Sequence, residues 1–105
     1  MTVKVISKHL GEGSFPTFAK GTDVIVQEAC THFLNWNACV IEGYRTYVPD
    51  CFVHDGKLLR DYNPTELVQN VGDILEVQEI VYAWLSAKNL NGVTGWIPAE
   101  NVVSV

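Results

Sequence analysis

The sequence predicts an all-β chain made of two small barrels or sandwiches, and three observations indicate this fold class. First, the two halves repeat each other: Gly21 and Gly72 are 51 residues apart, and Trp36 and Trp84 are 48 apart. A period near 50 residues is typical of two copies of one folded unit. Second, short runs rich in Val, Ile, Thr and Tyr alternate with turn residues. Third, no segment keeps the apolar period of a helix.

Four strands are predicted in the first half, because each run is β-branched or aromatic and is bounded by Gly, Asp or Asn. Pro49 follows the last of them and repeats at Pro98 with an offset of 49 residues. A proline at that point predicts a single 3₁₀ turn after the strand. The predicted strands cover residues 2–6, 23–28, 37–41 and 46–48.

The second half repeats this order, and Asn91-Gly92 predicts a tight hairpin because both residues tolerate positive φ. Asp55-Gly56 is another tight turn, and we expect it to be a short link that holds two units in close contact. The predicted domains are therefore residues 1–54 and 55–105. The strands expected in the second half cover residues 58–59, 74–80, 84–88 and 95–97.

Composition indicates a globular chain, since 48% of its 105 residues are hydrophobic and 18% are charged. No run approaches the roughly 20 apolar residues that cross a bilayer. The first eight residues alternate apolar and polar side chains, which differs from a secretory signal. Three cysteines form no complete disulfide framework. Together these features favour a reducing, cytoplasmic location.

The net charge is −5, and seven basic residues are scattered along the chain. Binding to phosphates needs clustered Lys and Arg. The charge therefore argues against nucleic acid or an anionic membrane as a partner, and an acidic second half favours a basic ligand.

The second half carries motifs of a known family over residues 57–105. The run 58–62, Leu-Leu-Arg-Asp-Tyr, is similar to the Ala-Leu-Tyr-Asp-Tyr strand that opens Src-homology-3 domains. The run 74–77, Ile-Leu-Glu-Val, matches the next strand of the family, and Trp84 takes the place of its groove tryptophan. The run 95–102, Gly-Trp-Ile-Pro-Ala-Glu-Asn-Val, resembles the family's Gly-Trp-Ile-Pro-Ser-Asn-Tyr-Val.

The first half resembles the same family more distantly, through residues 16–21, Trp36 and residues 48–53. The whole chain resembles a bacterial-type tandem of Src-homology-3-like domains. This resemblance implies two such barrels in tandem, packed through a short linker. It also implies non-catalytic recognition of a peptide or protein segment, proline-rich or basic, in a groove of aromatic residues and proline.

The groove positions can be carried over one residue at a time. Arg60 and Asn101 stand where the family has Tyr, so each groove departs from the family pattern. The resemblance implies no cofactor and no metal. The ligand-binding residues that it implies are Trp36, Pro49, Phe52 and Phe15 in the first unit, and Tyr62, Trp84 and Pro98 in the second.

Strand alternation predicts which side chains lie inside. Trp36 and Trp84 each precede an expected core residue, Cys39 or Ala87, by three positions, so both indoles are expected to point outward. An outward indole needs a ligand or a neighbouring unit to cover it. Trp96 is expected to be structural. The other expected core residues are Val24, Val26, Val48, Leu75, Val77 and Ile97.

Other functions remain open on the sequence. The chain could be an assembly module whose grooves are buried between units or in a homodimer, or a binder of bacterial cell-wall peptides. Asp61, Glu66 and Glu79 form either a solvated rim or a site for a basic ligand. Zinc binding or thiol chemistry would use soft ligands at unusual spacing, and we expect neither. Those ligands would be Cys30, His32, Cys51 and His54.

Overall fold

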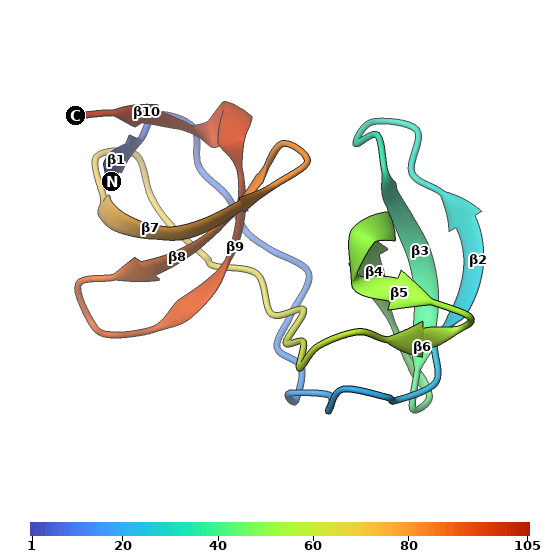
Figure 1. Ribbon diagram of the computed structural model, residues 1–105. Coiled ribbons are helices and arrows are strands. Elements are labelled where there is room, and N and C mark those ends of the chain that lie inside the picture. Colours follow the sequence, from blue (N-terminus) through green and yellow to red (C-terminus); the bar gives the residue numbers. More distant parts are fainter. The chain divides into compact units, whose positions relative to one another are not determined.

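The computed structural model describes all residues, 1–105, as ten short strands and two 3₁₀ turns, and it confirms the all-β class (Figure 1). All pairing between strands is antiparallel. No helix is long or apolar enough to cross a membrane.

The chain divides into two compact units. Unit 1 consists of Met1–Ser14 together with Thr65–Val105, and unit 2 consists of Phe15–Pro64. This differs from the expected division between residues 54 and 55, because those residues lie within the turn of a hairpin of unit 2. Unit 2 therefore interrupts unit 1 in the sequence.

Unit 1 contains one five-stranded sheet in the order β10-β1-β7-β8-β9. The first strand, β1, lies inside this sheet between β10 and β7, where Val3 is opposite Ser104 on one side and Leu75 on the other. Its alternate residues Val3 and Val5 are buried, as a half-buried strand requires. The elements are β1 (Thr2–Val5), β7 (Ile74–Val81), β8 (Trp84–Asn89), β9 (Thr94–Pro98), the 3₁₀ turn η2 (Ala99–Asn101) and β10 (Val102–Ser104).

The core of unit 1 is formed by seven buried apolar residues from the sheet and from one connecting segment. Leu67 comes from that segment, which runs parallel to β9 through the bridge between Glu66 and Trp96. The other members are Val3, Val5, Leu75, Leu85, Ala87 and Ile97.

Unit 2 contains a three-stranded sheet in the order β2-β3-β4 and a two-stranded hairpin of β5 and β6. The hairpin turns at Asp55-Gly56, where both residues have positive φ, as a tight two-residue turn demands. The elements are β2 (Ile25–Ala29), β3 (Trp36–Ile41), β4 (Tyr44–Pro49), the 3₁₀ turn η1 (Asp50–Phe52), β5 (Val53–His54) and β6 (Lys57–Leu58).

The sequence repeat is visible in the structure, because β2-β3-β4-η1-β5 has the same order as β7-β8-β9-η2-β10. A register shift in β2 leaves Gln27 unpaired between Val26 and Glu28, and the same shift in β7 falls at Gln78. The repeated glutamines thus mark two β-bulges. The predicted 3₁₀ turns after Pro49 and Pro98 are confirmed.

The segment 57–62 pairs within unit 2 rather than with the strands that follow it. Phe18 and Tyr62 exchange two main-chain hydrogen bonds, and the Leu59 N–H donates to the Phe52 oxygen at 2.8 Å. The place that this segment was expected to take in the second unit is filled instead by β1. Residues 57–62, expected to open the second unit, thus belong to unit 2, and β1, expected to open the first unit, belongs to the sheet that contains β7.

Most of the expected core residues are buried, but one expectation is wrong. Val24, Val48 and Leu75 are at most 6% exposed, whereas Val26 is 48% exposed. Val26 lies in β2, which is the edge strand of its sheet, and all five residues of this strand are exposed. Val77 is partly buried, and Ala87, Ile97 and Trp96 are buried as expected.

Candidate functional site

Five of the seven residues expected to bind a ligand lie in unit 2. Trp36 and Pro49 are opposite each other across β3 and β4. Phe52 follows in η1, and its ring meets the ring of Tyr62 edge-on, with centroids 5.4 Å apart. Tyr62 was assigned by sequence to the other unit, so that grouping is wrong. Pairing of residues 57–62 with residues 18–22 and 52 explains the change.

These four side chains are buried, with Trp36, Phe52 and Tyr62 each 4% exposed and Pro49 fully buried. The expectation of an outward Trp36 is therefore wrong. Alternation does put it on the side of β3 opposite Cys39, but that side is covered at this end of the strand. They form two buried pairs, Trp36 with Pro49 and Phe52 with Tyr62, which we call the floor residues, and neither pair is an open shelf.

Two further residues, Arg60 and Tyr47, contact the second pair and are more exposed than the floor residues. The Arg60 guanidinium lies over the Phe52 ring, 4.4 Å from its centroid, in a cation–π contact. Tyr47 is 37% exposed, and its main-chain oxygen accepts a 2.6 Å hydrogen bond from the Tyr62 hydroxyl. We call Trp36, Pro49, Phe52, Tyr62, Arg60 and Tyr47 the aromatic cluster of unit 2.

Phe15 lies in a second group of rings in unit 2. Its ring meets that of Tyr44 at 6.1 Å, and Tyr44 in turn lies 5.7 Å from Phe18. Phe15 is half-buried and Tyr44 is 45% exposed. Phe15 and Phe18 thus both lie against the Tyr44 ring.

The remaining two predicted residues, Trp84 and Pro98, are opposite each other in unit 1, as Trp36 and Pro49 are in unit 2. Trp84 is half-buried, and the His9 ring packs edge-on against it at 5.8 Å. Asn101, which stands where the family has Tyr, is buried and donates hydrogen bonds to the Ser7 and Lys8 carbonyl oxygens. In unit 1 the segment before His9 is thus tied down beside the Trp-Pro pair.

Two of the acidic residues considered for a basic ligand have partners within the chain. Asp61 accepts a hydrogen bond from the Lys20 N–H at 2.8 Å. Glu66 forms an ion pair with His9 at 3.1 Å, and its side chain is only 10% exposed. These contacts weaken the argument for a basic ligand.

Zinc and thiol chemistry find no support in the geometry. No three His, Cys, Asp or Glu side chains lie close enough together to hold a metal ion. Burial raises the pKa of Cys30, with a smaller contribution from Glu28, and burial raises the pKa of Cys39 to about 12. A higher pKa disfavours the thiolate that nucleophilic chemistry requires.

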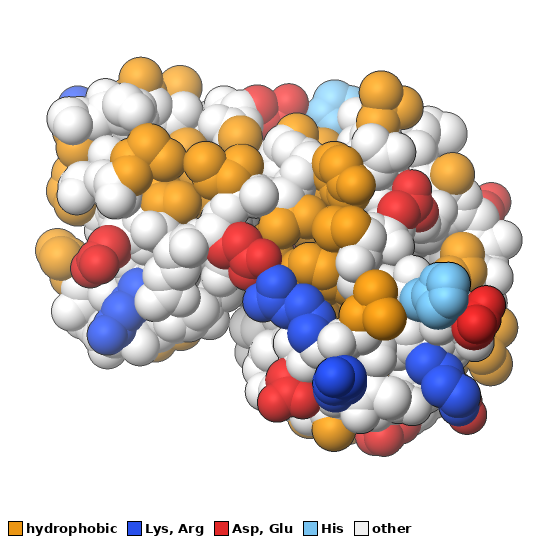
Figure 2. Space-filling model, viewed as in Figure 1, with side chains coloured by type: hydrophobic (Ala, Val, Ile, Leu, Met, Phe, Trp, Pro, Cys, Tyr) orange, Lys and Arg blue, Asp and Glu red, His pale blue; other side chains and the backbone are white.

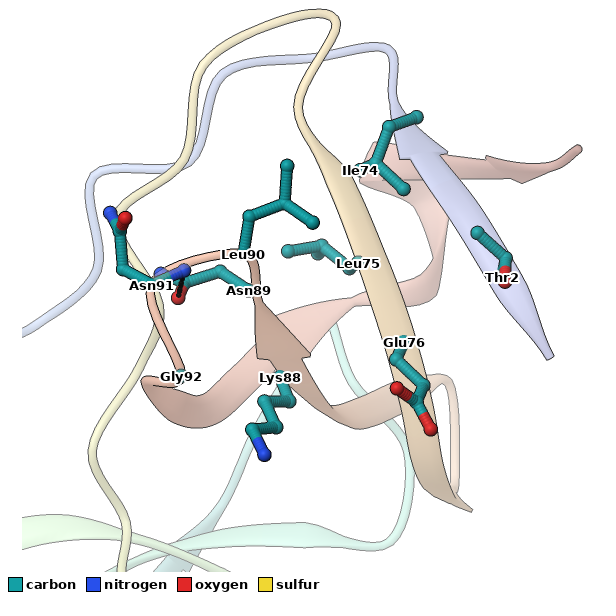
Figure 3. Close-up of a pocket in the computed structure, with 9 residues that line it drawn as sticks. All are labelled: Thr2, Ile74, Leu75, Glu76, Lys88, Asn89, Leu90, Asn91 and Gly92. Carbon is teal, nitrogen blue, oxygen red and sulfur yellow. Dashed lines mark hydrogen bonds between the residues drawn. The ribbon is translucent and has the colours of Figure 1, made fainter.

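Unit 1 also has a shallow pocket of about 540 Å³, and none of the predicted ligand-binding residues lines it. Figure 3 shows that its lining side chains come from β1, β7 and β8 and from the turn after β8. Glu76 and Lys88, which are opposite each other in the sheet, give it one charge of each sign. Nothing in this lining indicates a particular ligand.

Apolar side chains are common on the surface of both units. Figure 2 shows them on one face among charged side chains of both signs. Comparison of the chain with protein-family models, with curated proteins and with solved structures gave no match.

The sequence reasoning missed Tyr47, Arg60 and His9 as members of these clusters. Tyr47 had a usable signal, since it lies two residues before Pro49 and so shares its side of β4. Arg60 was noted only as a departure from the family pattern. His9 had no signal, because its contact with Trp84 joins residues that are distant in the sequence.

Proposed function

We propose that the chain is a non-catalytic binding module of two Src-homology-3-like barrels, and that the aromatic cluster of unit 2 recognises an extended, proline-rich protein segment. The repeated order of strands and 3₁₀ turns supports the barrel assignment, together with the motifs at residues 58–62 and 95–98. The main support for binding is that one unit holds the Trp36–Pro49 pair and the Phe52–Tyr62 pair, with Arg60 over the Phe52 ring.

The exposed residues of the aromatic cluster, Arg60 and Tyr47, indicate which ligand is favoured. Arg60 presents a guanidinium on an aromatic face, and a planar guanidinium pairs well with a carboxylate. The Tyr47 side chain is 37% exposed and has an apolar face with a polar tip, which suits a proline ring. Since Asp61 and Glu66 already have partners, we propose a ligand that carries an acidic residue beside its prolines.

Three synthetic twelve-residue proline-rich peptides, carrying Asp, Lys or no charge, test this proposal by ¹H–¹⁵N NMR titration. The Asp peptide is expected to bind most tightly and to shift amides of residues 36–62. Arg60→Glu is expected to reverse the order of the Asp and Lys peptides, and Tyr47→Ala to weaken all three. Lys57→Glu, which changes an exposed charge elsewhere in unit 2, is the matched control.

Failure of all three peptides to shift the amides of unit 2 would end this proposal. The burial of the four floor residues favours a second candidate in that case, an assembly module in which the aromatic cluster is structural. Sedimentation equilibrium then tests this candidate, because an assembly module is expected to self-associate.

A further inference from the structure

His9 lies between two hydrogen-bond acceptors in unit 1. Its Nδ1 is 2.7 Å from the Leu67 carbonyl oxygen, and its Nε2 is 3.1 Å from the Glu66 carboxylate. A carbonyl oxygen and a carboxylate only accept, so each contact needs an N–H on the ring. Imidazolium has both N–H groups, whereas neutral imidazole has one. The geometry therefore fits the protonated ring.

The contacts are shielded from water and tied to the main chain. The His9 and Glu66 side chains are 14% and 10% exposed. The main-chain N–H of His9 donates to the main-chain oxygen of Gln69 at 3.0 Å, and the main-chain N–H of Gln69 donates to the main-chain oxygen of His9 at 2.9 Å. Gly11 comes so close to Glu66 that a Cβ at Gly11 would be 3.2 Å from the Glu66 Cβ. Residues 7–11 thus pack directly on the segment 66–69.

This packing also covers the Trp-Pro pair of unit 1. The His9 ring contacts Trp84 edge-on, with an interplanar angle of 76°. Trp84 is opposite Pro98, so His9 occupies one side of that pair.

We propose that His9 is a protonation-controlled clasp: with both ring nitrogens protonated it holds residues 7–11 against unit 1 and over Trp84. When His9 gives one proton to solvent, one of its two hydrogen bonds is lost, the segment loosens, and Trp84 becomes more accessible. This clasp regulates the Trp-Pro pair of unit 1 and does not depend on the binding proposed for unit 2.

The electrostatic surroundings agree with this direction. The hydrogen bond to Glu66 is the largest cause that raises the pKa of His9 above its usual 6.5, and the Leu67 oxygen and Glu12 add to it, while burial opposes it. Glu66 and Glu12 are the charged groups that face the ring, and the Leu67 oxygen, the Trp84 ring and Gln69 are neutral. The clasp is therefore complete below pH 6.5 and is lost as the pH rises through the raised pKa.

The test is NMR of the full chain labelled with ¹⁵N and 5-fluorotryptophan, from pH 5.5 to 8.5. The His9 ring is expected to titrate with a midpoint above 6.5, and the Trp84 fluorine signal, identified in Trp84→Phe, is expected to shift with the same midpoint. Amide protection at His9 and Gln69, corrected for the intrinsic rate, is expected to fall by up to about tenfold, as the loss of one hydrogen bond implies.

Two conservative variants and one control sharpen the result. His9→Gln is expected to abolish the pH dependence of the Trp84 signal, and Glu66→Gln to lower the His9 midpoint. His54→Gln alters an exposed histidine of unit 2 and is expected to change neither signal. The clasp is refuted if the Trp84 signal still titrates in His9→Gln, or if amide protection at His9 and Gln69 does not depend on pH in the parent.

Discussion

The Tyr62 hydroxyl donates a 2.6 Å hydrogen bond to the main-chain oxygen of Tyr47. Tyr62 ends the segment that pairs with Phe18, and Tyr47 lies in β4. This bond therefore joins residues 57–62 to the three-stranded sheet of unit 2, at the place where the aromatic cluster forms. The segment 57–62 is thus bonded to the sheet of unit 2.

Tyr62→Phe is expected to lower the free energy of unfolding by about 1 kcal/mol, because the ring stays in place while a partly buried hydrogen bond is lost. Urea unfolding followed by tryptophan fluorescence measures the difference. Tyr44→Phe, which changes a tyrosine that is 45% exposed, is the control and is expected to have little effect. Equal stability of Tyr62→Phe and the parent would show that this bond does not hold the segment.

Gly95→Ala is expected to destabilise unit 1 by about 1–3 kcal/mol, because the new methyl group has no room. A Cβ at this position would lie 3.0 Å from the Thr65 oxygen and 3.1 Å from two atoms of Leu67. Thermal unfolding of Gly95→Ala and of Thr94→Ala, which changes an exposed neighbour, measures the effect. The Thr94 variant is expected to stay within about 0.5 kcal/mol of the parent, and an equally small change at Gly95 would contradict the close packing.

Val48→Ala and Val26→Ala are expected to differ although both remove the same two methyl groups from unit 2. Val48 is completely buried, so its truncation is expected to cost about 2 kcal/mol. Val26 is 48% exposed on the edge strand, so its truncation is expected to cost less than about 0.5 kcal/mol. Chemical unfolding of the two variants measures these differences in the free energy of unfolding. Similar losses of stability in both variants would mean that β2 is covered in solution.

Iodoacetamide at pH 8 is expected to modify the three cysteines at very different rates. Cys51 is exposed and reacts first, whereas Cys39 is buried and has its pKa raised to about 12, so it reacts only after unfolding in urea. Cys30 is half-buried with a raised pKa and is expected to fall between them. Peptide mass spectrometry over time gives the order, and early labelling of Cys39 would be incompatible with its place in the core.

His9→Gln is expected to reduce stability by about 1 kcal/mol at pH 5.5 and by progressively less as the pH rises to 8.5. The folded-state pKa of His9 is raised, so its stabilising contribution is present at low pH and disappears above that pKa. Comparing parent and variant at each pH cancels the titration of other groups. A stability difference between the parent and His9→Gln that increases with pH would contradict this prediction.

The local structure was largely predictable from the sequence. The strands, the Asp55-Gly56 and Asn91-Gly92 turns and the 3₁₀ turns after Pro49 and Pro98 follow from side-chain preferences that act over a few residues. Gln27 and Gln78, which are 51 residues apart in the repeat, are the bulge residues of β2 and β7. Only the register of the strands shows that they are bulges.

The candidate site was predictable only in part. Trp36 and Pro49 were correctly placed together, as were Trp84 and Pro98, because a strand and its neighbour in a hairpin fix their own register. Tyr62 was put in the wrong unit, and the burial of Trp36 was missed. Alternation tells on which side of a strand a residue lies, but the cover over that side comes from distant segments.

The sequence by itself determined that this protein is all-β, that its two halves repeat, and where its strands and turns lie. Only the tertiary structure decided that β1 completes unit 1 and that residues 57–62 complete unit 2. The physical reason is that both segments are short and each contributes two buried apolar residues, Val3 and Val5 in one and Leu58 and Tyr62 in the other, so each satisfies the local requirements of a strand in either unit. The choice between the two pairings depends on which one buries those residues and hydrogen-bonds their main chain, and that is a property of the whole fold.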